Sequence, residues 1–213
     1  MASPDCMRPS RPHAPPRRLV IATGNPGKLR EFQALLEGLS FAPVSQASLG
    51  VIAPEETGST FLSNALLKAR HAAAATGEPA IADDSGLEVD ALGGAPGVYS
   101  ARYAGLGADD AANNAKLLRA LAEIPPGERR ARYRCVLVYV DGPDDPSPLT
   151  ADGVWEGTIV ETPRGTGGFG YDPHFWLPEL EMTAAELDPG EKNRLSHRGR
   201  AMRELRAQLA ARA

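Results

Sequence analysis

The segment from Arg132 to Val140 (RYRCVLVYV) constrains the fold more than any other part of the chain. Apolar side chains occupy both of its alternating sets of positions: Cys135, Leu137 and Tyr139 in one, and Val136, Val138 and Val140 in the other. A strand that is apolar on both faces is typical of the centre of a sheet that is covered on both sides. We therefore predict a sheet with this segment as a central strand.

Strands and helices alternate along the rest of the chain. Apolar runs predict further strands at 19–23, 41–44, 80–82, 87–92, 153–160 and 174–177. Apolar residues at helical spacing predict four helices, at about 26–39, 61–76, 110–124 and 197–211. This order of elements predicts an α/β fold.

Bulk properties narrow the class of protein. The chain has 213 residues, enough for a sizeable core, and a formal net charge of −4. Because there is no basic excess, we expect no nucleic-acid polymer as a partner. Two cysteines offer no disulfide framework, which predicts a cytoplasmic protein. No apolar run approaches the roughly 20 residues that a membrane helix needs.

The first 18 residues differ in composition from the rest. They contain five prolines and four arginines, and their few apolar residues show no period. We expect residues 1–18 to be a disordered Pro/Arg-rich leader and residues 19–213 to form a single domain.

A strand, a glycine-containing turn and a helix start follow one another at Thr23 to Lys28 (TGNPGK). Asn25 is a favourable N-cap, and Pro26 suits the first helical position. Free N–H groups and the positive end of the helix dipole would face one spot there, and Lys28 adds a full charge. The segment therefore predicts an anion site, although a plain strand-to-helix connection has the same pattern.

Two aspartates interrupt an apolar run at residues 80–86 (AIADDSG). Ser85 and Gly86 favour a turn after Asp83 and Asp84. Carboxylates at a strand end beside a glycine-rich loop can bind Mg²⁺ and let phosphates approach the backbone. An acidic turn in a polar β-hairpin has the same sequence pattern, so both interpretations stay open. Alternation points neighbouring side chains to opposite faces, so we do not expect both carboxylates to serve one metal.

Three glycines in Thr166 to Pro173 (TGGFGYDP) argue against a regular element there. Phe169 and Tyr171 are then aromatic rings carried on a loop. Such rings among glycines more often stack on a planar ligand or cover a cleft than fill a core.

Cationic and polar side chains mark two helices. Lys192, His197 and Arg198 gather near the start of the last helix, although a helix N-terminus disfavours cations. Asn64 and Lys68 lie one turn apart on the second helix, where a solvated face and a ligand contact are equally good interpretations. The last helix has Ser196 as its expected N-cap.

Together these segments resemble the inosine/xanthosine triphosphate pyrophosphatase family, which hydrolyses non-standard purine nucleoside triphosphates. The matching motifs run over about 19–209 in the family's order: TGNPGK, EETG, ADDSGLEVDALGGAPGVYSARYAG, GTGGFGYDP and EKNRLSHRGRA. The resemblance implies an elongated mixed β-sheet flanked by helices, with two lobes and an active-site cleft between them. It also implies a homodimer, Mg²⁺ as cofactor, and a catalytic domain at 19–213 that converts ITP, dITP or XTP to the nucleoside monophosphate and pyrophosphate.

The resemblance also assigns roles to residues. Asp84 is implied as the proton acceptor and a metal ligand, and Glu55 as a second metal ligand, with Glu56 beside it as the alternative. Asp83 is left a supporting role such as holding the turn. The residues implied to bind substrate are Thr23, Gly24, Asn25, Pro26, Gly27, Lys28, Ser85, Phe169, Gly170, Tyr171, Asp172, Lys192, His197 and Arg198.

Base selection and two competing functions follow from these roles. Donors such as Arg198 or His197 would accept the 6-oxo group of hypoxanthine or xanthine, whereas adenine would leave them unpaired. A Maf-like nucleotide pyrophosphatase would instead prefer pyrimidine or modified-pyrimidine triphosphates. A non-catalytic nucleotide sensor would bind without turnover, but it would need neither the metal nor the base that Glu55 and Asp84 imply.

Overall fold

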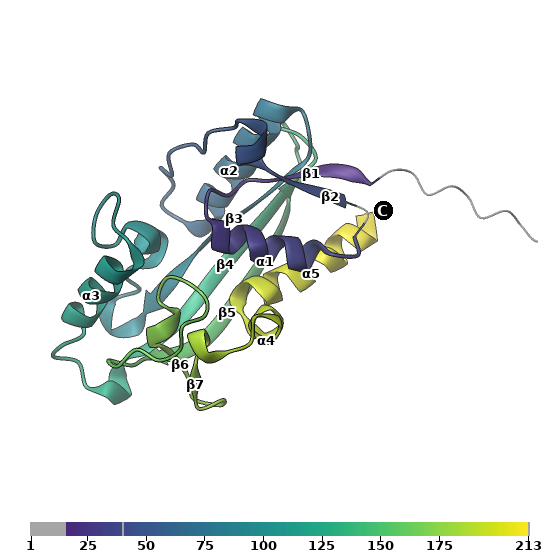
Figure 1. The fold of residues 1–213 in the computed structure, drawn as a ribbon. Helices are drawn as coiled ribbons and strands as arrows, with labels where there is room; N and C mark the ends of the chain where they lie inside the picture. The colour runs from purple at the N-terminus through teal and green to yellow at the C-terminus, as the bar shows by residue number, and fades with distance from the viewer. Residues whose placement is uncertain (1–15, 40, 213) are drawn as a thin grey trace, which may run out of the picture.

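The structure is a computed structural model that describes residues 16–39 and 41–212. In these residues seven strands form one mixed sheet in the order β2-β1-β3-β4-β5-β6-β7 (Figure 1). β1 is parallel to β2 and β3, and all other neighbours are antiparallel. The strands are β1 (Arg17–Ile21), β2 (Phe41–Ser45), β3 (Ala80–Val89), β4 (Arg130–Val140), β5 (Leu149–Ile159), β6 (Phe175–Leu177) and β7 (Met182–Thr183).

The helices begin where capping residues satisfy their first N–H groups. Asn25 caps α1, Thr60 forms a capping box with Ser63 at the start of α2, and Asp109 caps α3. Short 3₁₀ helices η2 (Asp90–Leu92) and η3 (Gly97–Arg102) follow β3. The α-helices are α1 (Pro26–Leu36), α2 (Phe61–Thr76), α3 (Asp110–Ala120), α4 (Pro189–Leu195) and α5 (His197–Arg212).

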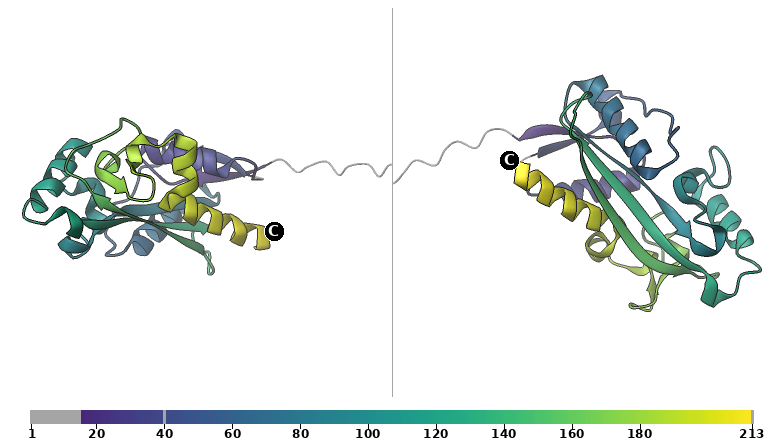
Figure 2. Two further views of the ribbon diagram at one scale, coloured as in Figure 1. Left: turned by 90° about the horizontal axis from the view of Figure 1, so that it is seen from below. Right: turned by 180° about the vertical axis from the view of Figure 1, so that it is seen from behind.

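β4 lies between β3 and β5 and contributes to three apolar cores, which confirms that it is a central strand. Leu137 and Tyr139 pack under α1 and α5, whereas Val138 and Val140 pack under α2 on the opposite face. The third core surrounds Tyr133, α3 and β6 at the other end of the sheet (Figure 1 and Figure 2). The two cores on opposite faces of the sheet make up one lobe, and the core around Tyr133 makes up the other. The expected mixed sheet flanked by helices is confirmed.

The predicted turn at Ser85 and Gly86 is wrong. β3 continues without a break from Ala80 to Val89 because β4 pairs with it along its whole length, with Ser85 opposite Cys135 and Gly86 opposite Arg134. Gly86 serves a different purpose. A Cβ there would lie 2.4 Å from both the carbonyl oxygen of Gly97 and Oγ of Ser100, so the glycine lets η3 pack directly on the strand.

Element boundaries differ from the predictions at several places. β1 already begins at Arg17, where pairing with β2 extends it, so the predicted leader overlaps the sheet by two residues. The rest of that prediction, residues 1–15, lies outside the described residues. The strand predicted at 87–92 ends at Val89, and α3 ends at Ala120 rather than near Ile124. α4 was not predicted. Among the described helices, none has the length and apolarity that crossing a bilayer requires.

Candidate active site

The start of α1 forms one wall of the candidate site. Asn25 Oδ1 accepts hydrogen bonds from the N–H groups of Gly27 (2.8 Å) and Lys28 (3.1 Å), and Thr23 Oγ1 accepts one from Asn25 N–H (3.2 Å). The predicted anion site therefore keeps its helix dipole and the Lys28 ammonium. Two of its N–H groups, however, are already satisfied by the Asn25 side chain.

A compact cluster of charges lies where β3 faces α2. The Nζ atom of Lys68 is 2.9 Å from Asp84 Oδ1 and 2.8 Å from Glu56 Oε1. Asn64 donates to the second Asp84 oxygen (3.1 Å), and Arg102 of η3 donates to the second Glu56 oxygen (2.7 Å). Glu56 is thus the glutamate that shares a cation with Asp84.

Burial and charge move the pKa values of this cluster in opposite directions. Burial raises the pKa of Asp84, and Lys68 offsets this only in part. Burial would also raise the pKa of Glu56, but the attraction of Lys68 outweighs it and holds that pKa below the ordinary value. The result is one carboxylate that binds a proton more readily than usual beside one that stays ionised.

Asp83 points to the other face of β3, as alternation predicts, and anchors three side chains through one oxygen. Its Oδ2 lies 2.9 Å from Lys28 Nζ, 3.0 Å from an Arg198 nitrogen and 3.0 Å from Ser85 Oγ. Burial would raise the pKa of Asp83, but Lys28 and Arg198 outweigh it and hold the pKa far below the ordinary value. Asp83 therefore links Lys28, at the N-terminal end of α1, to Arg198 of α5. It does not hold a turn.

Arg198 and Lys192 meet acidic partners from three separate segments. Arg198 is fully buried and pairs with Glu31 of α1 as well as with Asp83. Lys192 lies 3.2 Å from Glu31 and 2.6 Å from Asp172. Because every buried cation here has a carboxylate partner, the cluster can lie deep between the lobes without an isolated charge.

Aromatic rings line the inner side of this cluster. His197 stacks on Tyr133, with ring centroids 4.7 Å apart and an interplanar angle of 10°. Burial and the nearby Arg198 and Lys192 lower the pKa of His197 well below its ordinary value, so the imidazole is neutral near pH 7. Phe169 lies over the start of α1, and Lys192 Nζ is 4.8 Å from its ring centroid. Phe169 is thus a half-buried ring between the start of α1 and Lys192.

Tyr171 differs from its loop neighbour Phe169. Its ring is buried in the core around α3, and its hydroxyl donates to the Ser100 carbonyl (2.8 Å). The prediction of two loop aromatics therefore separates into one exposed to the pocket and one that anchors the loop to η3.

Comparison with known proteins assigns this arrangement to a family. A model of the Ham1 family matches residues 19–208. The chain belongs to the Ham1 family. A dITP/XTP pyrophosphatase of Thioalkalivibrio sulfidiphilus is 58% identical over 92% of this chain and 100% of its own length. A dITP/XTP pyrophosphatase of Shigella flexneri is 56% identical over 89% of this chain and 96% of its own length.

Solved structures agree with this assignment. A HAM1 protein from Coxiella burnetii superposes with a TM-score of 0.85 at 50% identity, covering 92% of this chain and 99% of that one. The Staphylococcus aureus Ham1 protein gives a TM-score of 0.81 at 41% identity, covering 92% of this chain and 100% of that one.

In this Ham1 chain the predicted residues surround two adjoining hollows. The carboxylate cleft, of about 560 Å³, is lined on its charged side by Lys28, Glu55, Glu56, Lys68 and Arg102, together with Thr23, Gly24 and Asn25. The cationic pocket, of about 100 Å³, is lined by Asn25, Lys28, Ser85, Phe169, Gly170, Tyr171, Asp172, Lys192, His197 and Arg198, among others. Asn25 and Lys28 line both.

Three predicted residues do not line either hollow. Pro26 is exposed, and Gly27 is buried beneath Phe169, where a Cβ would lie 2.6 Å from the ring. Asp84 contacts the carboxylate cleft through Lys68. Glu55 lines the cleft but is exposed, so of the two neighbouring glutamates only Glu56 turns inward to Lys68 and Arg102.

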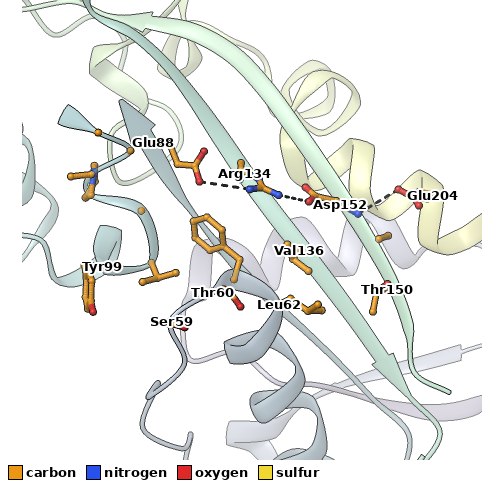
Figure 3. Close-up of a pocket in the computed structure, with 18 residues that line it drawn as sticks. Ser59, Thr60, Leu62, Glu88, Tyr99, Arg134, Val136, Thr150, Asp152 and Glu204 are labelled. Atoms are coloured by element: carbon orange, nitrogen blue, oxygen red, sulfur yellow. Dashed lines mark hydrogen bonds and ion pairs between the residues drawn. The ribbon is translucent and has the colours of Figure 1, made fainter. Parts of the chain in front are cut away.

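A hollow of about 860 Å³, larger than either of these two, lies elsewhere, on the face of β4 and β5 near the start of α2 (Figure 3). Acidic side chains of Glu88, Asp152 and Glu204 line this groove, and Arg134 lies between Glu88 and Asp152. With its one lining arginine already paired, the groove would repel phosphates. Size alone therefore does not identify the site.

The sequence predictions missed several residues of the Ham1 site. Glu31 holds both Arg198 and Lys192, yet in the sequence it is an ordinary polar position of a helix. Arg102 and Tyr133 were also not singled out, although Tyr133 donates to Asp172 (3.1 Å) and stacks on His197. Lys68, for which the sequence left a solvated face and a ligand contact open, pairs with Asp84 and Glu56. An i, i+3 relation between Lys28 and Glu31 is the only sequence signal, and it is common on helix surfaces.

Proposed function

We propose that this chain hydrolyses non-standard purine nucleoside triphosphates of the dITP and XTP type to the nucleoside monophosphate and pyrophosphate. The observation that carries the proposal is that the carboxylate cleft and the cationic pocket meet at Lys28, which lines both. A carboxylate with a raised pKa and two cations lie on one side of it, and a cationic, aromatic pocket lies on the other. The names of relatives with more than half of their residues identical support the same substrate class.

We propose Mg²⁺ as the cofactor, held by Asp84 and Glu56. The described residues contain no group of three metal-ligating side chains, so the protein's share would be these two carboxylates. This donor set fits Mg²⁺, which commonly binds one or two carboxylates and takes its other ligands from phosphates and water. Lys68, Asn64 and Arg102 bind all four oxygens of Asp84 and Glu56, so a bound ion would replace some of these contacts. A bound ion would neutralise charge on the leaving pyrophosphate.

Asp84 is the proposed proton acceptor. Its raised pKa makes it a better base than an exposed aspartate. It would take a proton from a water that attacks the α-phosphorus, and the bond from that phosphorus to the oxygen of the β-phosphate would break. Lys28, Lys68 and Arg102 line the cleft where the departing pyrophosphate would carry its charge.

The cationic pocket is the proposed base site. Of the two donors predicted for a 6-oxo group, Arg198 has both terminal nitrogens bonded to Glu31, Asp83 and Ser85, while its Nε is buried and has no hydrogen-bond partner among the described residues. His197 Nδ1 is buried and has no hydrogen-bond partner among the described residues. We therefore propose His197 Nδ1 and Arg198 Nε as the donors open to the 6-oxo group and Phe169 as the ring that stacks on the purine.

A product assay tests the proposal. Purified protein with Mg²⁺ is incubated with dITP, XTP, dGTP, dATP and dTTP, and the phosphate products are identified. We expect pyrophosphate from dITP and XTP and little turnover of the others. Preferred turnover of dTTP would instead favour Maf-like specificity, and tight binding of dITP without turnover would favour a sensor.

We also propose a homodimer that uses the groove of Figure 3 as its contact surface. Leu62 and Tyr99 line the groove with 46% and 58% of their surfaces exposed, and would supply apolar contacts.

Light scattering after size exclusion tests the dimer. We expect twice the chain mass for the wild type and for Ile52→Asp, a control at a residue that is 83% exposed and outside the groove. The double variant Leu62→Asp/Tyr99→Asp should run as a monomer. A monomeric wild type would exclude the dimer, and a dimeric double variant would exclude this surface.

A cytoplasmic location is proposed as well. Cys135 is a buried free thiol, and a cysteine without a disulfide partner suits a reducing compartment.

A further inference from the structure

The backbone of Gly170 is hydrogen-bonded through both its N–H and its carbonyl to side chains of α3. Its N–H donates to Asp110 Oδ2 (2.6 Å), and its carbonyl accepts from Asn114 Nδ2 (2.9 Å). The same Asn114 nitrogen also donates to the Asp110 carbonyl (2.9 Å), so the two side chains act as one clamp. α3 belongs to the lobe around β6, whereas the loop that carries Gly170 reaches across to α1.

Gly170 needs such a clamp because of where it lies. It has a φ of +65°, and Gly168 has a φ of +72°, so this part of the loop follows a path that only glycine adopts readily. Phe169 precedes it, and Asp172, which holds Lys192, follows two residues later. Any freedom at Gly170 would therefore move both the stacking ring and the anchor of a pocket cation.

The clamp is not explained by helix stability. Asp109, not Asp110, is the N-cap of α3, where its Oδ1 accepts from Ala112 N–H (2.8 Å). Asp110 instead turns to the loop, and both Asp110 and Gly170 line the cationic pocket. Two neighbouring aspartates thus have separate partners, one within the helix and one across the pocket.

We propose that Asp110 and Asn114 are positioning residues that fix the Gly170 peptide and thereby set the affinity and selectivity of the base site. This inference rests on the proposed hydrolysis of dITP-type substrates. The clamp lies in the cationic pocket, away from the cluster of Asp84, Lys68 and Glu56 on the α2 face of β3. Its loss should therefore weaken binding and discrimination and leave the chemical step unchanged.

Three variants separate this role from helix capping and from simple charge. Asp110→Ala removes the acceptor, Asp110→Asn keeps an acceptor oxygen without the charge, and Asp109→Ala removes the helix cap alone. We measure kcat and KM for dITP and dGTP, the melting temperature, and the dissociation constant of dITP in an Asp84→Asn background by calorimetry.

We expect Asp110→Ala to raise both KM and the dissociation constant for dITP about tenfold, as the loss of one charge-assisted hydrogen bond implies, with kcat retained. Asp110→Asn should restore most of the lost affinity for dITP. Asn114→Ala should weaken the binding of dITP in the same way as Asp110→Ala. Asp109→Ala should lower the melting temperature and leave KM unchanged.

Unchanged KM and selectivity in Asp110→Ala would overturn the clamp while leaving the proposed activity intact. Equal losses in Asp109→Ala and Asp110→Ala would also overturn it, because they would reduce the effect to the stability of α3. A wild-type protein that releases no pyrophosphate from dITP would refute the proposed function itself. The affinity measurement would still report whether the clamp affects binding.

Discussion

Asp83 and Asp84 are adjacent in sequence and opposite in chemistry. Asp83 faces α1 and α5, where Lys28 and Arg198 hold its pKa far below the ordinary value. Asp84 faces α2, where burial outweighs Lys68 and raises its pKa. The two environments differ because strand alternation sends neighbours to opposite sides of the sheet. One aspartate is thereby fixed as a permanent anion that holds cations, and the other can exchange a proton.

The largest effect is expected for the aspartate that exchanges a proton. Asp84→Asn should lower kcat about 10²- to 10⁴-fold, the usual contribution of a general base, because the amide cannot accept the proton. Steady-state kinetics with dITP, together with a melting curve, measure this. Near-normal kcat in a folded variant would remove Asp84 from the chemistry.

Asp83→Asn should act on stability rather than on the chemical step. It would leave Arg198 and Lys28 without their shared carboxylate, and breaking such a buried pair costs about 3–5 kcal/mol. Urea unfolding gives the change in free energy, and Ser85→Ala serves as the control that removes a neutral hydroxyl bonded to both Asp83 and Arg198 but keeps the ion pairs. A stability loss no greater than that of Ser85→Ala would contradict the anchoring role.

Glu31→Gln tests the second carboxylate that pairs with Arg198, besides Asp83. The pKa of Glu31 is lowered in the fold because Arg198 and Lys192 outweigh burial. Its contribution, about 1.5–3 kcal/mol for hydrogen bonds to charged groups, should be complete above the unfolded pKa near 4.5 and be lost as the pH falls below it. Unfolding of both proteins at pH 7 and pH 3.5 tests this, since the difference should shrink at the lower pH. A difference that is constant with pH would exclude the ionised pairing.

The smallest effect concerns the cation beside Asp84. Lys68 lowers the pKa of Asp84, so Lys68→Met should raise it further, by about one unit for each 1.4 kcal/mol of lost attraction. Because Asp84 acts when ionised, activity falls as the pH drops through its pKa, and the acid limb of kcat should move to higher pH. Lys68→Arg keeps the charge and should keep the limb in place. Movement to lower pH in Lys68→Met would assign that limb to another group.

The fold was largely predictable, because periodicity and capping depend on local sequence. The central strand, the cap at Asn25, and most helices follow from such patterns. The turn at Gly86 was wrong because a glycine needed for close packing of η3 has the same sequence signal as a turn glycine.

The site was predictable only as a set of segments. Sequence motifs indicate which segments meet, but they do not give the partners within them. Glu31, Arg102 and the clamp residue Asn114 act through contacts with segments more than 40 positions away, and no local pattern reports such contacts. The inward glutamate of the pair at 55–56 also depends on the path of a loop, which the two identical letters cannot distinguish.

β4 supplies side chains to all three apolar cores, so the two lobes share one central strand. Because of this shared strand, we expect that neither lobe can unfold while the other stays folded. Loss of packing at Leu137 or Tyr133 would be felt on both sides of the cleft, and unfolding should be a single cooperative event. For an enzyme whose two half-sites come from different lobes, this means that unfolding removes recognition and chemistry together.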